Sequence, residues 1–117
     1  MYYIFPDVNN RGELYKSIHP KKQEVVYQLL QDVPPNIEAI GVFGSALTPH
    51  CKDDSDIDII IIASTYNHEF KTKGLGVDVL DYRSLDSLVE SAEVGGFNSI
   101  AYNIINEGVF IYEKKPA

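Results

Sequence analysis

Sulfur chemistry is nearly absent from this sequence, because Cys51 is its only cysteine. A single cysteine forms no internal disulfide and cannot build a cysteine-rich zinc site. Residues 1–10 have no basic segment ahead of their apolar side chains, so they do not resemble a signal peptide. No run approaches the roughly 18 apolar residues that a membrane span requires. We therefore expect a protein of the reducing cytoplasm with no membrane span.

Basic residues are also scarce: 10 Lys and Arg stand against 17 Asp and Glu, giving a net charge of −7. Proteins that hold nucleic acid on their surface cluster Lys and Arg to neutralise phosphates. The basic residues here form only small pairs: Lys21/Lys22, Lys71/Lys73 and Lys114/Lys115. Strong nucleic-acid binding is therefore not expected, and a polyanionic substrate would need a divalent metal to offset its charge.

Apolar residues, in contrast, are sufficient for a core, since 44% of the 117 residues are hydrophobic. A chain of this length predicts a single domain, which we place at residues 17–117. Residues 1–16 form an N-terminal arm in this interpretation. The arm is either an edge strand or a segment packed on the domain or on a partner.

Hydrophobic periodicity predicts the order α-β-β-β-α-α-β. A helix begins at a Ser17 or His19 cap and ends before Pro34 and Pro35. The other predicted elements are strands at 37–43, 56–63 and 77–82, helices at 84–93 and about 97–106, and a strand at 109–112. Only about a dozen residues join the second and third strands, which favours an antiparallel pair over a βαβ unit. The fold class is α/β or α+β, with a small mixed sheet flanked by helices.

An acidic pair enters the second strand. Side chains alternate along a strand, so Asp56 and Asp58 share one face while Ile57 and Ile59 share the other. Neighbouring carboxylates repel each other, and burial removes their hydration. Such a pair is expected either at a solvated edge or around a cation.

A calcium-binding EF-hand loop is excluded. Asp54, Asp56 and Asp58 match the spacing of its first ligands. Ile59, however, stands where the sharp turn needs glycine, and Thr65 stands where a bidentate glutamate belongs.

Two further features flank the acidic pair. Gly44–Ser45 directly follows an apolar strand, and such a turn offers backbone N–H groups and a hydroxyl to phosphate oxygens. The dipeptide alone is far more often a structural turn than a phosphate site, and the chain has neither a Walker loop nor a GxGxxG motif. In the third strand, Asp78 lies between valines and Asp81 points to the opposite face. We predict that Asp78 is the one that joins Asp56 and Asp58.

Taken together, these features resemble the nucleotidyltransferase superfamily of DNA polymerase β. V42-F43-G44-S45 matches its turn after an apolar strand, S55-D56-I57-D58-I59-I60 matches its paired acids, and D78 matches its third acid. The resemblance covers about residues 20–113 and is best to the small stand-alone branch, the minimal nucleotidyltransferases. The closing segment 105–113 also looks like the usual end of that branch.

The resemblance implies the roles of these residues. Asp56 and Asp58 would bind two Mg²⁺ ions, and Asp78 would complete the metal site and activate the attacking hydroxyl. Gly44 and Ser45 would hold the β- and γ-phosphates of a nucleoside triphosphate. An acceptor hydroxyl would attack the α-phosphate in line and release pyrophosphate, with the two metals stabilising the entering and leaving oxygens.

The resemblance also implies the substrates and partners. An NMP group, AMP from ATP, would move to an acceptor such as a tyrosine of a helical HEPN toxin, the present chain being the antitoxin. Self-association is the other way to complete so small a domain. The alternative is a module with the same fold but weak or no catalysis, which regulates a partner by contact.

One departure bears on that choice. The branch often reads G-S-R-A-R-G, whereas this chain reads G44-S45-A46-L47-T48-P49 and lacks both arginines. Their loss favours the binding module, and the three acids favour the enzyme. The candidates to supply the missing positive charge are Lys52, Lys71, Lys73 and Arg83, and spacing does not choose among them.

Overall fold

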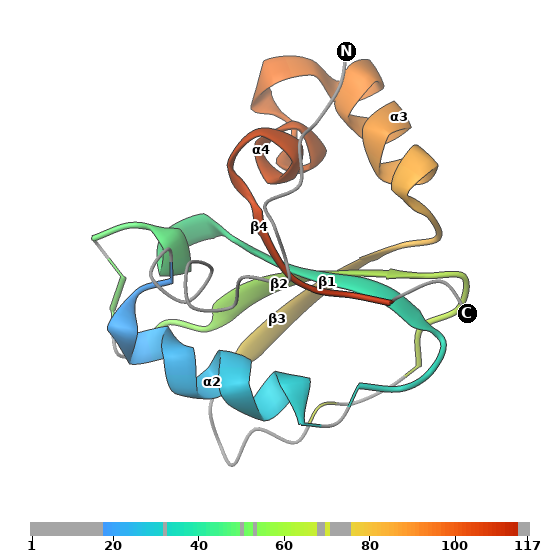
Figure 1. Cartoon of the computed structure of the whole chain (residues 1–117). Coiled ribbons are helices and arrows are strands. Elements are labelled where there is room, and N and C mark those ends of the chain that lie inside the picture. Colours follow the sequence, from blue (N-terminus) through green and yellow to red (C-terminus); the bar gives the residue numbers. More distant parts are fainter. Residues whose placement is uncertain are drawn as a thin grey trace.

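The computed structural model has a sheet with helices on both faces (Figure 1). It describes residues 18–31, 33–49, 51–52, 54–67, 70 and 76–114, so the predicted arm at 1–16 lies outside the described residues. The elements in chain order are α2 (Pro20–Leu30), β1 (Ile37–Phe43), the 3-10 helix η1 (Gly44–Leu47), β2 (Ile57–Ala63), β3 (Val77–Tyr82), α3 (Leu85–Gly95), the 3-10 helix η2 (Gly96–Asn98), α4 (Ile100–Glu107) and β4 (Val109–Glu113). None of these helices is both long and apolar enough to cross a membrane.

The first helix forms where its capping signals predict. The Nδ1 of His19 accepts a hydrogen bond from the backbone N–H of Lys21 at 3.2 Å, and Pro20 occupies the first turn. Pro is tolerated there because the first N–H groups of a helix have no intrahelical partner. The predicted bounds of β1 and β3 are also confirmed.

The sheet has the strand order β3-β2-β1-β4. Strand β1 is antiparallel to β2 and to β4, but β2 and β3 are parallel, so the predicted antiparallel pairing of β2 with β3 is wrong. Residues 64–76 connect the two strands, and at about 3.3 Å per extended residue a segment of this length is long enough to return along β2. In this connection, Tyr66 and Phe70 stack at 6.5 Å and pack on the core cluster under α2.

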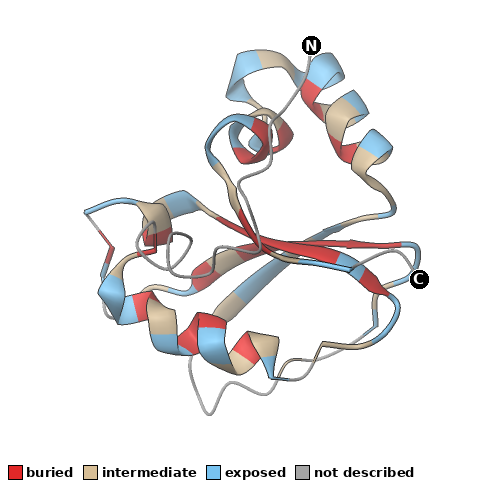
Figure 2. Cartoon of the chain, in the orientation of Figure 1, coloured by how far each residue is buried: buried red, intermediate tan, exposed pale blue. Residues whose placement is uncertain are grey.

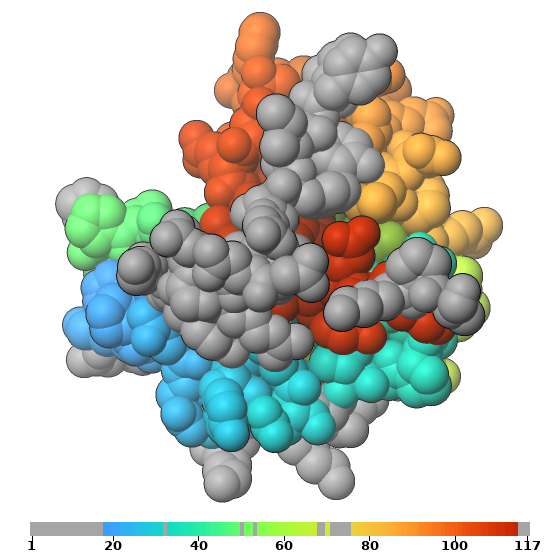
Figure 3. Space-filling view, viewed as in Figure 1, coloured from blue at the N-terminus to red at the C-terminus, as the bar shows by residue number. Residues whose placement is uncertain are grey.

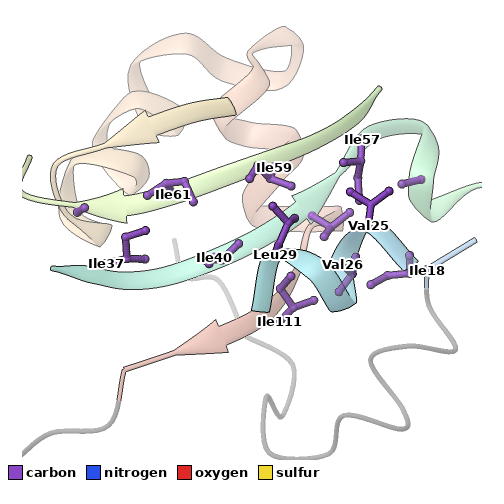
Figure 4. Close-up of a cluster of buried hydrophobic side chains, with 13 residues drawn as sticks. Ile18, Val25, Val26, Leu29, Ile37, Ile40, Ile57, Ile59, Ile61 and Ile111 are labelled. Carbon is purple, nitrogen blue, oxygen red and sulfur yellow. The ribbon is translucent and has the colours of Figure 1, made fainter. Parts of the chain in front are cut away.

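Strand β2 is buried on both faces. Ile57, Ile59 and Ile61 point toward α2, where they join a cluster with Val25 and Leu29 (Figure 4). Ile60 and Ile62 point the other way, against α3 and α4. Burial of such a side chain contributes about 1.5–3 kcal/mol. The sheet therefore has a rigid central strand between two apolar layers, and Figure 2 shows the buried residues along it.

Helices α3 and α4 cover the other face as a hairpin. The helix predicted at about 97–106 is split: η2 occupies Gly96–Asn98, and Ser99 then begins α4 by accepting the N–H of Tyr102 at 3.1 Å. In the space-filling view, α3 and α4 rise from one side of the molecule and α2 lies on the other (Figure 3).

Candidate active site

The residues predicted for the site gather at the start of β2. Asp58 is the register partner of Phe43 on one side and of Asp78 on the other. Phe43 ends β1, so Gly44 and the η1 turn lie at the same end of the sheet. Asp56 precedes the first residue of β2. The chain thus brings its three acids and the Gly44–Ser45 turn together.

The choice of Asp78 over Asp81 is confirmed. Residues in register on adjacent strands share a face of the sheet, so Asp58 and Asp78 lie side by side. Asp81 pairs with Ile61 and faces the α2 side. Asp58 is half-buried, whereas Asp56 and Asp78 are exposed.

The carboxylates of Asp56 and Asp78 lie close enough to Asp58 to repel its negative charge. The pKa of Asp58 is raised above its ordinary value, first by burial and then by the carboxylates of Asp78 and Asp56. Each of these effects disfavours the ionised form of Asp58. A divalent cation among the three carboxylates would offset both the repulsion and the lost hydration.

The donor set suits Mg²⁺, which prefers carboxylate oxygens together with water and substrate phosphates. Within the described ranges, no three His, Cys, Asp or Glu side chains are grouped closely enough to hold one ion together. The carboxylate oxygens and negative charge of Asp56, Asp58 and Asp78 suit Mg²⁺ in kind, although these side chains do not form a three-ligand group as they stand. Their side chains would have to draw closer around it.

Two glycines allow the carboxylates to lie against the backbone. Gly44 has φ 76°, and a Cβ added there would lie 2.6 Å from Oδ2 of Asp58. A Cβ added to Gly76, the residue before β3, would overlap Oδ1 of Asp56. A side chain at either position would displace an acid of the site.

The η1 turn is held by hydrogen bonds and by packing, and it carries no charged side chain. The carbonyl of Ser45 accepts the backbone N–H of Thr48 at 3.0 Å and its hydroxyl at 2.9 Å. Ala46, which replaces the first arginine of the G-S-R-A-R-G pattern discussed above, is only 1% exposed and packs in the core under α2. Its carbonyl accepts the N–H of His19 at 2.7 Å. This turn supplies backbone and hydroxyl groups but no cation.

Sequence reasoning missed two residues beside the site. Lys22, which looked like half of a surface pair, is buried, and its Nζ donates to the carbonyl of Ser55. The burial of Lys22 could have been predicted from its spacing, because it lies on the same helical face as Val25, Val26 and Leu29. Gly76 carried no signal, because its contact with Asp56 depends on the parallel pairing of β2 and β3. Of the earlier cation candidates, Lys52 and Arg83 are exposed, and Lys71 and Lys73 lie outside the described residues.

Comparison with protein families gives one match. The family model described as "Polymerase beta, Nucleotidyltransferase" matches residues 24–117, which include all of the predicted site residues. Neither the curated proteins nor the solved structures give a significant match. The family match does not distinguish the minimal branch, which stays a prediction. Since the match spans most of the sequence, this chain belongs to the polymerase β nucleotidyltransferase family.

Proposed function

We propose that this domain is a Mg²⁺-dependent nucleotidyltransferase of the minimal type, which transfers AMP from ATP to an acceptor hydroxyl. The observation that carries the proposal is the pairing of Asp58 with Asp78 on adjacent strands, at the sheet end where Gly44 begins a turn. Family membership supports nucleotidyl transfer as the reaction class.

Each group has a defined part in the proposed reaction. Two bound Mg²⁺ ions would supply charge stabilisation of the entering and leaving oxygens. Asp56 and Asp58 hold the metal, Asp58 from a rigid strand. Gly44 and Ser45 receive the β- and γ-phosphates through backbone N–H groups and the Ser45 hydroxyl. Asp78 completes the metal set and accepts the proton of the attacking hydroxyl.

The acceptor comes from a second protein. Strand β3 is at the edge of the sheet, and Asp78, Val79 and Asp81 on it are exposed, so a partner can approach the site from this side. A tyrosine of a helical HEPN-type toxin is the proposed acceptor, and modification of that tyrosine would make this chain an antitoxin. A second copy of the chain is the other proposed partner.

A binding module is the second candidate function. The buried Ala46 favours it, because the turn that would receive the triphosphate provides no cation of its own. Such a module would neutralise its partner by contact and would still capture it after loss of Asp56, Asp58 and Asp78.

The test uses the purified chain with ATP labelled in its α-phosphate, Mg²⁺ and the candidate acceptor protein. The enzyme should transfer the label to the acceptor, and Asp56→Ala/Asp58→Ala should not. Equal labelling by wild type and variant, or no label from either, would reject the enzymatic function. The binding module would be supported if the wild-type chain transfers no label but captures the partner, and if the variant that lacks Asp56, Asp58 and Asp78 captures it as well.

A further inference from the structure

Lys22 breaks the pattern of the helix that carries it. The face of α2 that packs on the sheet consists of Lys22, Val25, Val26 and Leu29. Lys22 is 5% exposed and is the one buried polar or charged side chain among the residues that the structure describes. Burial of an ammonium group is costly unless the group has polar partners. A residue that departs from an otherwise apolar pattern in this way is often retained for a functional reason.

One polar partner of Lys22 lies beside the proposed metal site. Its Nζ donates to the carbonyl oxygen of Ser55, which belongs to the peptide bond between Ser55 and Asp56. Lys22 and Ser55 are 33 positions apart, so this contact ties α2 to the loop before β2.

Asp56 needs such a contact more than Asp58 does. Asp58 lies within β2 and is fixed by the strands on both sides, whereas Asp56 precedes the strand. Asp56 is confined from the other side by Gly76, whose carbonyl accepts the N–H of Ile57 at 3.1 Å and whose backbone lies against the Asp56 carboxylate. The peptide that carries Asp56 is therefore held between Lys22 and Gly76.

We propose that Lys22 is a positioning residue, which holds the Ser55–Asp56 peptide so that the Asp56 carboxylate is aimed at the metal that the proposed function requires. Lys22 acts through Asp56 and touches neither metal nor nucleotide. Contacts of this kind behind a metal ligand typically change metal affinity by about 10–100-fold.

The experiment measures Mn²⁺ binding alone, from the loss of the free-ion signal in electron paramagnetic resonance, so it needs no substrate or turnover. Mn²⁺ accepts the same oxygen ligands as Mg²⁺. Lys22→Met keeps the apolar stem and removes the donor, and it should weaken Mn²⁺ binding by about tenfold. The matched control is Lys21→Met, on the exposed side of the same turn, which should bind Mn²⁺ as wild type does.

A double-mutant cycle separates positioning from general structure. In an Asp56→Asn background, Lys22→Met should have no further effect, because the carboxylate that it positions is gone. In an Asp78→Asn background, it should still weaken Mn²⁺ binding by about tenfold. Equal weakening in both backgrounds would mean that Lys22 only supports the fold, and the proposal would be wrong. If Lys22→Met does not fold, Lys22→Gln, which keeps a shorter donor, replaces it in the same cycle.

The outcome for wild type distinguishes the two proposals. If wild type binds Mn²⁺ and Lys22→Met binds it equally well, only the role of Lys22 is refuted. If wild type binds no Mn²⁺, the metal-dependent function fails, and the role of Lys22 fails with it.

Discussion

The two ends of β2 have opposite surroundings. From Ile59 to Ala63 every residue is buried, with α2 on one face and α3 and α4 on the other. At the first end, Asp58 is the one residue of the strand that is not fully buried, and it faces Asp78 across the register. One strand therefore contains both a fully buried apolar run and a carboxylate whose pKa is raised by burial and by neighbouring like charges.

This difference shows how a small domain can hold repelling carboxylates in place. The apolar half of β2 fixes the strand, so Asp58 cannot turn away from Asp78 without disturbing the core. The raised pKa of Asp58 is the thermodynamic sign of that constraint. In the proposed function, a metal ion would relieve the repulsion once the side chains of Asp56, Asp58 and Asp78 have drawn closer around it.

The largest expected effect is the loss of transfer in Asp58→Asn. The change keeps the shape of the side chain and removes the anionic ligand. Metal charge stabilisation is worth several kcal/mol, so the transfer rate should fall by about a thousandfold or more. Rates of label transfer from ATP would measure it. A variant that retains most of the activity would show that the acidic end of β2 is not the site.

Substitutions in the apolar half of β2 should instead change the stability of the fold. Ile62→Ala removes a fully buried side chain four residues from Asp58 and should lower the free energy of unfolding by about 2–5 kcal/mol. Val79→Ala, at a side chain that is 39% exposed, should change it by less than about 0.5 kcal/mol. Urea denaturation of the three proteins would measure both values. Equal costs at the two positions would contradict the two-layer core.

Gly76→Ala should affect the site without affecting the fold. The backbone of Gly76 is outside the left-handed region, so alanine fits there apart from its overlap with the Asp56 carboxylate. We expect displacement of Asp56 and a loss of Mn²⁺ affinity of about tenfold, with a melting temperature close to that of wild type. Unchanged Mn²⁺ affinity would show that Asp56 is not a ligand. A large fall in melting temperature would show that Gly76 is required for the stability of the fold rather than for the site.

The smallest expected effect is a gain in the stability of the metal-free protein when Asp58 is replaced by asparagine. The pKa of Asp58 is higher in the folded chain than in the unfolded chain, so the unfolded state releases this proton at lower pH. Stability is therefore lost as pH rises through that range, and above it the ionised Asp58 destabilises the fold. Without metal, Asp58→Asn should melt at a higher temperature than wild type at pH 7, and the difference should shrink as the pH falls into the acidic range. A lower melting temperature at pH 7 would contradict this electrostatic account.

The sequence predicted the order and bounds of most elements well, because these follow from local patterns. Alternation along the strand, together with the flanking valines, correctly put Asp78 rather than Asp81 on the face of Asp58. Asp56 precedes β2, so its predicted position on the same strand face stays a prediction. The cap at His19 was likewise a local signal. The metal, the nucleotide and the acceptor stay predictions, since they rest on the resemblance and not on these patterns.

The errors and omissions concern contacts between distant segments. The direction of β3 depends on the connection between β2 and β3, in which Tyr66 and Phe70 pack on the core under α2, and no periodic pattern in the sequence predicts this packing. The contact of Gly76 with Asp56 follows from that direction. Lys22 could have been identified from its helical spacing, but its partner at Ser55 depends on the tertiary fold.

The most direct test of the central claim, that the acidic end of β2 binds metal with nucleotide, is thermal denaturation with and without Mg²⁺ and ATP. A ligand at a hundred times its dissociation constant stabilises a fold by about 2.7 kcal/mol, which is easily seen as a rise in melting temperature. The account predicts this rise for wild type when both Mg²⁺ and ATP are present, and no rise for Asp58→Asn. The same rise in the variant, or none in wild type, would contradict it.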